Sequence, residues 1–206
     1  MSTLLFVSHP EVTVDSNMPV EQWQLSAVGV ERMRAFSRSS IPSKVRAIWS
    51  STETKAIEAA GILGGALGLG IRVSKDLGEN DRSATGFLPP AEFEAVADAF
   101  FASPATSVRG WERAIDAQTR VREAVTRIVS EHTDGDLAIV AHGAVGTLMY
   151  CALSGNAIAR SFDQPFQGHY WAASFSDLVP RHGWIPIAPR PRPSRPASRA
   201  PQGEGY

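Results

Sequence analysis

Short apolar runs alternate with segments of helical periodicity along most of the chain. The continuous apolar run at residues 4–7 predicts a strand covered on both faces, and residues 45–49, 71–73 and 137–141 are the further predicted strands. Apolar residues at helical spacing predict helices after Ser26 and at residues 56–67, 91–101, 108–132 and 146–153. Residues 75–90 are predicted to form a loop, and residues 169–174 and 183–187 are candidate edge strands. This order predicts an α/β fold, a three-layer sandwich around a mostly parallel central sheet.

Local signals mark where two of these helices begin and end. Ser26 precedes the first helical segment and has the side chain of a typical N-cap. The sequence Ser50-Ser51-Thr52-Glu53 has the spacing of a capping box, which predicts a helix start at this point. Gly68 follows the same helical segment and is expected to end it.

Composition places the chain among ordinary globular proteins. Hydrophobic residues make up 43% and charged residues 20% of its 206 residues, which excludes wholesale disorder and fibrous repeats. The formal charge of −1 provides no bulk attraction to nucleic acid or to an anionic membrane. We therefore expect neither nucleic acid nor a membrane as a partner.

The end of the chain differs from the rest. Residues 189–206 contain four arginines and one glutamate, a charge of +3 that leaves −4 for residues 1–188. This segment is rich in proline, arginine and serine and has few apolar side chains to bury, so a disordered Pro/Arg-rich tail is predicted. Its PxxP spacing permits binding to an SH3-like groove or to a polyanion, although a tail without a specific partner is the favoured interpretation. One folded domain is expected in residues 1–188.

The cysteine content and the start of the sequence bear on the expected location of the protein in the cell. The only cysteine, Cys151, cannot form an internal disulfide, and residues 4–7 lack the basic lead-in of a secretory signal. These features predict a cytoplasmic protein. Residues 137–159 carry no formal charge and are long enough to span a bilayer. Their glycines, His142 and Asn156 instead favour a buried strand followed by a buried helix.

Two distant segments share one design. His9 and His142 each follow an apolar strand and a small residue, and each precedes a chain-breaking residue, Pro10 or Gly143. In a parallel sheet both histidines would lie at the carboxyl ends of strands, where open α/β folds bind ligands. The pair therefore predicts a functional site.

Several chemistries use two histidines. A metal site usually adds a third ligand at a recognisable spacing, and neither HxH nor HExxH occurs in this sequence. A serine hydrolase elbow of the G-x-S-x-G type is also absent. Phosphoryl transfer remains, which needs a nucleophilic imidazole, further positive groups and a proton donor for the leaving group.

The sequence resembles the histidine phosphatase superfamily, which is also called the phosphoglycerate mutase-like or RHG-type family. The family's landmarks are matched in family order by LFVSHPEV at 5–12, WQLSAVG at 23–29, SSTETKA at 50–56, LGE at 77–79 and VAHG at 140–143. The resemblance extends from residue 3 to about residue 187 and excludes the tail. It implies a phosphoglycerate mutase-like fold and a histidine-phosphatase-like catalytic domain in residues 1–188.

The resemblance also implies roles for individual residues. His9 would be phosphorylated, and His142 would be the second imidazole, donating to the phosphoryl group. Glu79 would protonate the leaving oxygen and then activate water. Lys55 would bind phosphate from a helix start, where the helix dipole already favours an anion. Neither a cofactor nor a metal is implied.

Two departures from the family pattern concern phosphate binding. The arginine before the nucleophilic histidine is replaced by Ser8, and the helix-start arginine is replaced by Lys55. Arginine grips phosphate through a planar fork, whereas lysine offers a point charge. Ser8 and Lys55 are nevertheless predicted to bind phosphate at these two positions. Arg82, three residues after Glu79, is predicted to supply the missing fork. A salt bridge of Arg82 to Asp81 or another neighbour is the alternative interpretation.

These observations leave three candidate functions. The first is a histidine-type acid phosphatase, a phosphoric monoester hydrolase that cleaves a small phosphorylated substrate through a phosphohistidine on His9. The second is a non-catalytic protein of the same fold that binds phosphate or other anions. A phosphoglycerate mutase is less favoured, because it needs extra substrate-binding basic residues and insertions that are poorly represented in a chain of this length. The substrate, the oligomeric state and the role of the tail are not readable from the sequence.

Overall fold

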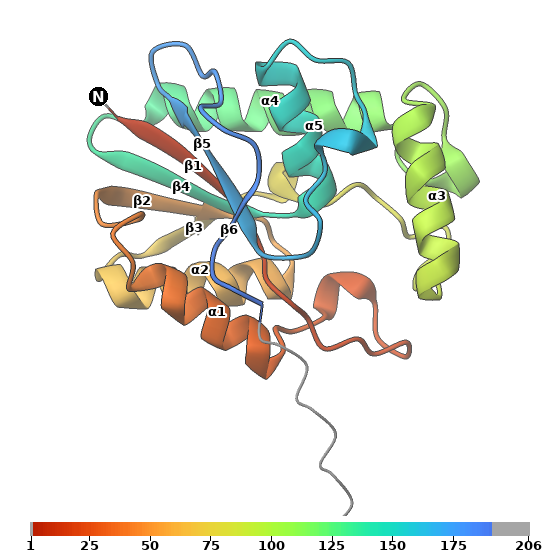
Figure 1. Ribbon diagram of the computed structural model, residues 1–206, viewed down its shortest axis with the longest axis horizontal. Helices are drawn as coiled ribbons and strands as arrows, with labels where there is room; N and C mark the ends of the chain where they lie inside the picture. Colours follow the sequence, from red (N-terminus) through yellow and green to blue (C-terminus); the bar gives the residue numbers. More distant parts are fainter. Residues whose placement is uncertain (1, 191–206) are drawn as a thin grey trace, which may run out of the picture.

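A six-stranded sheet forms the centre of the computed structural model, which describes residues 2–190 (Figure 1). Its strands are β1 (Thr3–Ser8), β2 (Val45–Ser50), β3 (Ile71–Val73), β4 (Asp136–Ala141), β5 (His169–Ser174) and β6 (Ile185–Pro186). They follow the order β3-β2-β4-β1-β5-β6 across the sheet. The first four in this order are parallel, whereas β5 and β6 add an antiparallel edge. The predicted mostly parallel α/β fold is confirmed.

Helices cover both faces of the sheet, so the molecule has three layers (Figure 1). On one face lie α1 (Ala27–Ser37) and α2 (Thr54–Leu67). On the other lie α4 (Ala114–Glu131) and α5 (Gly143–Leu153), with α3 (Pro90–Ala102) at one end of this layer. Single turns of 3₁₀ helix occur at Val20–Gln22, Lys75–Leu77, Val108–Gly110 and Arg160–Phe162.

Strand β1 contains an apolar run, Leu4–Val7, without any polar residue. Leu4 and Phe6 are buried in the core beneath α4 and α5, whereas Leu5 and Val7 are buried in the core beneath α1 and α2. Side chains alternate between the two faces of a strand, and here both faces are covered by helices. Every position of the run is therefore apolar.

The local helix signals have different outcomes. The Ser26 hydroxyl accepts a hydrogen bond from the Gly29 amide at 3.0 Å, so the predicted N-cap of α1 is confirmed. Gly68 ends α2 in the left-handed conformation, at φ 68°. The predicted capping box is wrong, because Glu53 itself is the N-cap of α2 and makes no side-chain capping bond. Its carboxylate is bound instead to the buried ammonium of Lys55.

The long helix predicted at 108–132 is wrong over its first six residues. Arg109 and Gly110 have positive φ angles of 52° and 83°, which interrupt helical geometry, and α4 begins only at Ala114. The buried Trp111 side chain explains the interruption. Its indole N–H donates to the Thr85 hydroxyl at 2.8 Å, which ties this segment to the 75–90 loop.

The uncharged segment 137–159 is a strand followed by a helix, as predicted, namely β4 and α5. Within residues 2–190, no helix combines the length and the apolar character needed to cross a membrane. The predicted disordered tail, residues 189–206, lies outside the described residues from position 191 onward.

Candidate active site

Three parallel strands end side by side and bring the candidate residues together. The His9 amide donates to the Ala141 carbonyl at 2.9 Å, and the Ser51 amide donates to the Val140 carbonyl at 3.2 Å. These bonds extend the sheet pairing past the ends of β1 and β2. As a result the imidazole rings of His9 and His142 lie with their centroids 5.2 Å apart at an interplanar angle of 69°.

The His9 ring is held by the backbone of the next residue. Its Nδ1 lies 2.9 Å from the Pro10 carbonyl oxygen, and only a protonated nitrogen can donate to a carbonyl. The neutral ring therefore carries its proton on Nδ1 and its lone pair on Nε2. Burial lowers the pKa of His9 well below 6.5, with smaller contributions from His142 and the positive charge of Lys55. His9 is thus neutral at pH 7.

His142 is held by a side chain from another strand end. The fully buried Ser51 hydroxyl lies 2.7 Å from its Nε2. Its Nδ1 is buried and has no hydrogen-bond partner within residues 2–190. Burial lowers the pKa of His142 well below 6.5, and the charges of Lys55, Arg82 and Arg120 add to this effect. A buried polar atom without a partner costs free energy, so a hydrogen bond from this nitrogen to a ligand would be favourable.

The carboxylate of Glu79 lies at the N-terminus of α5, directly after His142. Its Oε1 accepts from the amides of Val145 at 3.0 Å and Asn80 at 3.1 Å, and its Oε2 accepts from Ala144 at 3.2 Å. Burial raises the pKa of Glu79 above 4.5, although the positive charge of Arg82 opposes this shift. A carboxyl group that keeps its proton to higher pH is suited to act as a general acid.

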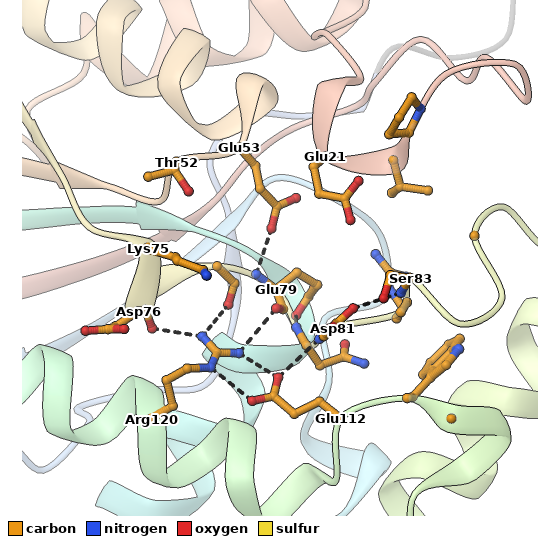
Figure 2. A pocket seen from close by; sticks show the side chains of 18 residues that line it. Glu21, Thr52, Glu53, Lys75, Asp76, Glu79, Asp81, Ser83, Glu112 and Arg120 are labelled. Atoms are coloured by element: carbon orange, nitrogen blue, oxygen red, sulfur yellow. Dashed lines mark hydrogen bonds and ion pairs between the residues drawn. The ribbon is translucent and has the colours of Figure 1, made fainter.

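The loop that carries Glu79 is clamped by Arg120 of α4 (Figure 2). Its guanidinium donates to the carbonyls of Asp76 at 2.9 Å, Gly78 at 3.0 Å and Glu79 at 3.2 Å. Glu112 accepts from the other side of the same guanidinium, at 3.0 and 2.8 Å. Arg120 therefore fixes the backbone position of the candidate acid.

Lys55 lies on the first turn of α2, as the resemblance predicted, but it is not a free cation. Its ammonium is buried and donates to Glu53 Oε2 at 2.5 Å and to the Val20 carbonyl at 2.8 Å. Glu53 Oε1 lies 3.2 Å from His142 Nε2 and accepts from the Glu79 amide at 2.8 Å. One carboxylate thus links the candidate phosphate-binding lysine to the segment that carries the candidate acid.

Ser8, the residue in place of the family's arginine, is fully buried at the end of β1. Its hydroxyl donates to Gln164 Oε1 at 2.5 Å and accepts from the His169 amide at 3.0 Å. These contacts join the end of β1 to the start of β5 and to the segment before it. The hydroxyl that was predicted to bind phosphate therefore already has protein partners.

Arg82 stacks on aromatic side chains rather than pairing with a neighbouring carboxylate. Its guanidinium carbon lies 5.2 Å from the ring centre of Phe93 and 5.6 Å from that of Trp111. Its charge is nevertheless close enough to shift the pKa values of Glu79 and His142 downward. Within residues 2–190 no salt bridge joins Arg82 to Asp81.

A cavity of about 890 Å³ lies between the 19–21 turn, the start of α2, the 75–86 loop and the segment before α4. Glu79 and Arg82 line it, whereas His9, His142 and Lys55 do not. Figure 2 shows the Glu53 carboxylate pointing toward the Glu79 segment, whose amide donates to it, with Glu21 nearby. Carboxylates outnumber cations along the cavity wall, with Glu21, Glu53, Asp76, Glu79, Asp81 and Glu112 against Lys75, Arg82 and Arg120. Across residues 2–190, no group of three or more His, Cys, Asp or Glu side chains is placed to hold a metal ion.

Three residues of the site are missing from the sequence prediction. Ser51 and Glu53 are interpreted there as parts of a capping box, and Arg120 lies in the long predicted helix without a role. The helix signal at 50–53 hides the two side chains that turn toward His142 and Lys55. A charged residue such as Glu53 immediately before an apolar helix is the signal that could have identified one of them.

Comparisons with known proteins identify the family and the fold of the chain. A family model for the histidine phosphatase superfamily (branch 1) matches residues 5–177. No curated protein matches the chain. Among solved structures, the native mycobacterial glucosyl-3-phosphoglycerate phosphatase has a TM-score of 0.77 at 20% identity, covering 91% of this chain and 100% of its own.

Two further structures show the same similarity. The complex of that mycobacterial phosphatase with inorganic phosphate has a TM-score of 0.74 at 21% identity, covering 91% of this chain and 98% of its own. A phosphoserine phosphatase from Entamoeba histolytica, in complex with 3-phosphoglyceric acid, has a TM-score of 0.70 at 13% identity, covering 87% and 94%. The described chain therefore has the phosphoglycerate mutase-like fold that the resemblance implied.

Proposed function

Because the chain belongs to the histidine phosphatase superfamily, branch 1, we propose that it is a phosphoric monoester hydrolase acting through a phosphohistidine on His9. The observation that carries this proposal is the bond from His9 Nδ1 to the Pro10 carbonyl. It leaves the lone pair on Nε2, and no group within residues 2–190 forms a hydrogen bond with that nitrogen. The substrate is a small phosphomonoester that enters through the cavity beside Glu79.

In the first step His9 Nε2 attacks phosphorus, and the bond from phosphorus to the ester oxygen breaks. Protonated Glu79 transfers its proton to the departing oxygen, so the alcohol leaves as a neutral molecule. The raised pKa of Glu79 and the lowered pKa of His9 support this division of roles. One group holds a proton and the other a lone pair at the same pH.

In the second step a water molecule attacks the phosphohistidine. Glu79, now ionised, takes a proton from the water, and the bond between phosphorus and His9 breaks. The electron pair returns to Nε2 and inorganic phosphate leaves. The three amides around Glu79 stabilise its ionised form between the two steps.

The charge on the phosphoryl group is shared by His142, Lys55 and Arg82 in this proposal. The proposal requires the Ser51 hydroxyl, 2.7 Å from His142 Nε2, to be the donor in this contact. The ring proton is then on Nδ1, the buried nitrogen that has no hydrogen-bond partner within residues 2–190. Lys55 contributes one ammonium proton that is not used by Glu53 or Val20. Arg82 reaches the phosphoryl group by leaving its aromatic stack.

A second candidate is a phosphate-binding protein without turnover. The specific observation in its favour is that the two positions expected to hold arginines are already engaged with protein groups. Ser8 is bonded to Gln164 and His169, and Lys55 is paired with Glu53. Such a protein would bind inorganic phosphate and form no covalent intermediate.

Rapid quenching of the reaction with a ³²P-labelled activated phosphoester tests the proposal. We expect acid-labile, base-stable label on the protein, and loss of both label and turnover in His9→Ala. His182 is a matched control, because its Nδ1 also lies beside a backbone carbonyl, at 2.7 Å from Gly183, but at an exposed position. His182→Ala should label normally. Turnover without label, or undiminished turnover in His9→Ala, would overturn the covalent mechanism, and phosphate binding without either would favour the second candidate.

A further inference from the structure

Glu53 presents a negative charge at the place where the proposed substrate needs positive ones. Its side chain is 10% exposed and contacts the cavity. Oε2 accepts from the Lys55 ammonium at 2.5 Å, and Oε1 accepts from the Glu79 amide at 2.8 Å. The same Oε1 lies 3.2 Å from His142 Nε2. The carboxylate therefore touches or adjoins three parts of the proposed machinery.

The Lys55 ammonium has three protons, and two of them are bonded to Glu53 and to the Val20 carbonyl. A phosphoryl oxygen that approaches Lys55 must share its charge with a carboxylate already in contact. Water is largely excluded from this pair, because the side chains of Lys55 and Glu53 are only 3% and 10% exposed. Repulsion between Glu53 and an incoming phosphate is therefore weakly screened.

We propose that Glu53 is a specificity-determining residue that competes with the phosphoryl group of the substrate for Lys55. The inference rests on the proposed function of the site, since it concerns the phosphate that this function requires. In the free protein Glu53 acts as an internal anion that neutralises Lys55. A ligand must displace the carboxylate or tolerate its charge, so doubly charged phosphate binds weakly to the unmodified site.

The opposite role for Glu53 is support, in which the carboxylate holds Lys55 and the Glu79 backbone in place for the ligand. The two roles predict opposite signs for one substitution. Glu53→Gln keeps the size of the side chain and an oxygen that can accept hydrogen bonds, but removes its charge. Competition predicts tighter phosphate binding in this variant, and support predicts weaker binding.

The experiment measures the affinity of the full chain for inorganic phosphate by isothermal titration calorimetry. We expect Glu53→Gln to bind phosphate about tenfold or more tightly than the unmodified protein, the size expected when one charge in a poorly screened contact is removed. Glu53→Ala should show a gain of the same sign, which keeps the test decisive if one variant folds poorly. Unchanged or weaker binding in the folded variants would overturn the proposal.

Two further variants locate the effect. Glu21→Gln removes the same charge from an exposed position on the cavity wall, and it should change phosphate affinity by less than about threefold at physiological salt. The double variant Glu53→Gln/Lys55→Met should bind phosphate no more tightly than Lys55→Met alone, because the proposed competition is for Lys55. A gain that persists there would overturn the assignment to Lys55.

Failure of the proposed function gives a different result. Phosphate binding is measured without turnover, so a protein that hydrolyses no ester still reports the sign of the Glu53→Gln effect. Tighter phosphate binding in Glu53→Gln together with absent hydrolysis in all variants would support the role of Glu53 and contradict the phosphatase.

Discussion

His9 and His142 follow nearly identical sequence patterns at the ends of two paired strands, β1 and β4, yet their surroundings differ. His9 bonds to the carbonyl of the next residue in its own chain segment. His142 bonds to Ser51, which is 91 residues away in sequence, and adjoins Glu53. A local bond fixes the tautomer of one ring, and a long-range bond fixes the orientation of the other.

This difference has a chemical consequence. The bond from Nδ1 to a carbonyl exposes a lone pair on His9 Nε2, as a nucleophile requires. The hydroxyl of Ser51 occupies Nε2 of His142 and leaves Nδ1 without a protein partner in the described chain. Two similar sequence patterns therefore produce histidines in different states, because the partner of each ring, and not the strand before it, decides which nitrogen has no protein partner in the described chain.

Replacing each imidazole should give the largest effects and separate the two roles. His9→Ala removes the nucleophile, so kcat/KM should fall by about 10⁴-fold or more and no label should form. His142→Ala removes one donor to the phosphoryl group, and kcat/KM should fall by about 10²- to 10³-fold. Quench-flow labelling provides the decisive readout, since His142→Ala should still form the phosphoenzyme slowly. Absent label in both variants would contradict this division.

The next effect concerns Arg82, whose charge acts on Glu79. Arg82→Ala should lower kcat/KM by about 10- to 100-fold, the loss of one charge-assisted contact reduced by the release of the aromatic stack. Because the charge of Arg82 holds the pKa of Glu79 down, the alkaline limb of the pH–rate profile should move to higher pH.

A matched surface arginine separates this local role from general electrostatics. Arg113 is half-exposed and paired with Asp116 at 2.6 Å, so Arg113→Ala should leave both the rate and the profile unchanged. A silent Arg82→Ala in an active enzyme would refute the idea that this guanidinium replaces the missing family arginine.

Ser51→Ala should have a smaller effect on turnover, about three- to tenfold, because one hydrogen bond to His142 is lost. The imidazole remains but is no longer held in one tautomer, so its ¹⁵N resonances should shift toward averaged values. A purely structural role of Ser51 would not produce this change. Ser50→Ala is the matched control, since the Ser50 hydroxyl is buried without a hydrogen-bond partner in residues 2–190. Equal rates for Ser51→Ala and the unmodified protein would remove Ser51 from the site.

The smallest expected effect is on stability and concerns a third buried histidine. Burial and the nearby charge of Arg32 lower the pKa of His169 to about 4. The unfolded chain binds this proton near pH 6.5, so unfolding takes up protons as the pH falls, and stability decreases from pH 7 to pH 5. His169 alone should account for about 2 kcal/mol of that decrease.

Urea unfolding at the two pH values measures this contribution. His169→Gln should reduce the difference between the free energies of unfolding at pH 7 and pH 5, whatever its effect at either pH. His182→Gln, at an exposed position, should leave the difference unchanged. A pH dependence that is the same in all three proteins would show that His169 does not titrate as described.

Much of the fold was predictable because its signals are local. The predicted strands β1, β2 and β4 and the N-cap at Ser26 depend on neighbours in the chain, and the structure confirms them. Where a local signal competes with a distant partner, the prediction fails. Glu53 has the position of a capping residue, but the ammonium of Lys55 is a stronger partner for its charge than a backbone amide.

The sequence by itself determined which residues could carry the chemistry, since the strand ends that hold His9 and His142 follow from residues next to each of them. Only the tertiary structure decided which hydrogen-bond partners these residues have. Arg120 holds the backbone of Glu79 from 41 positions away, and Ser8 bonds to Gln164 across 156 positions. The protonation state and the free donors of each group depend on such distant partners, because burial and hydrogen bonds set pKa values and tautomers only after the chain has folded.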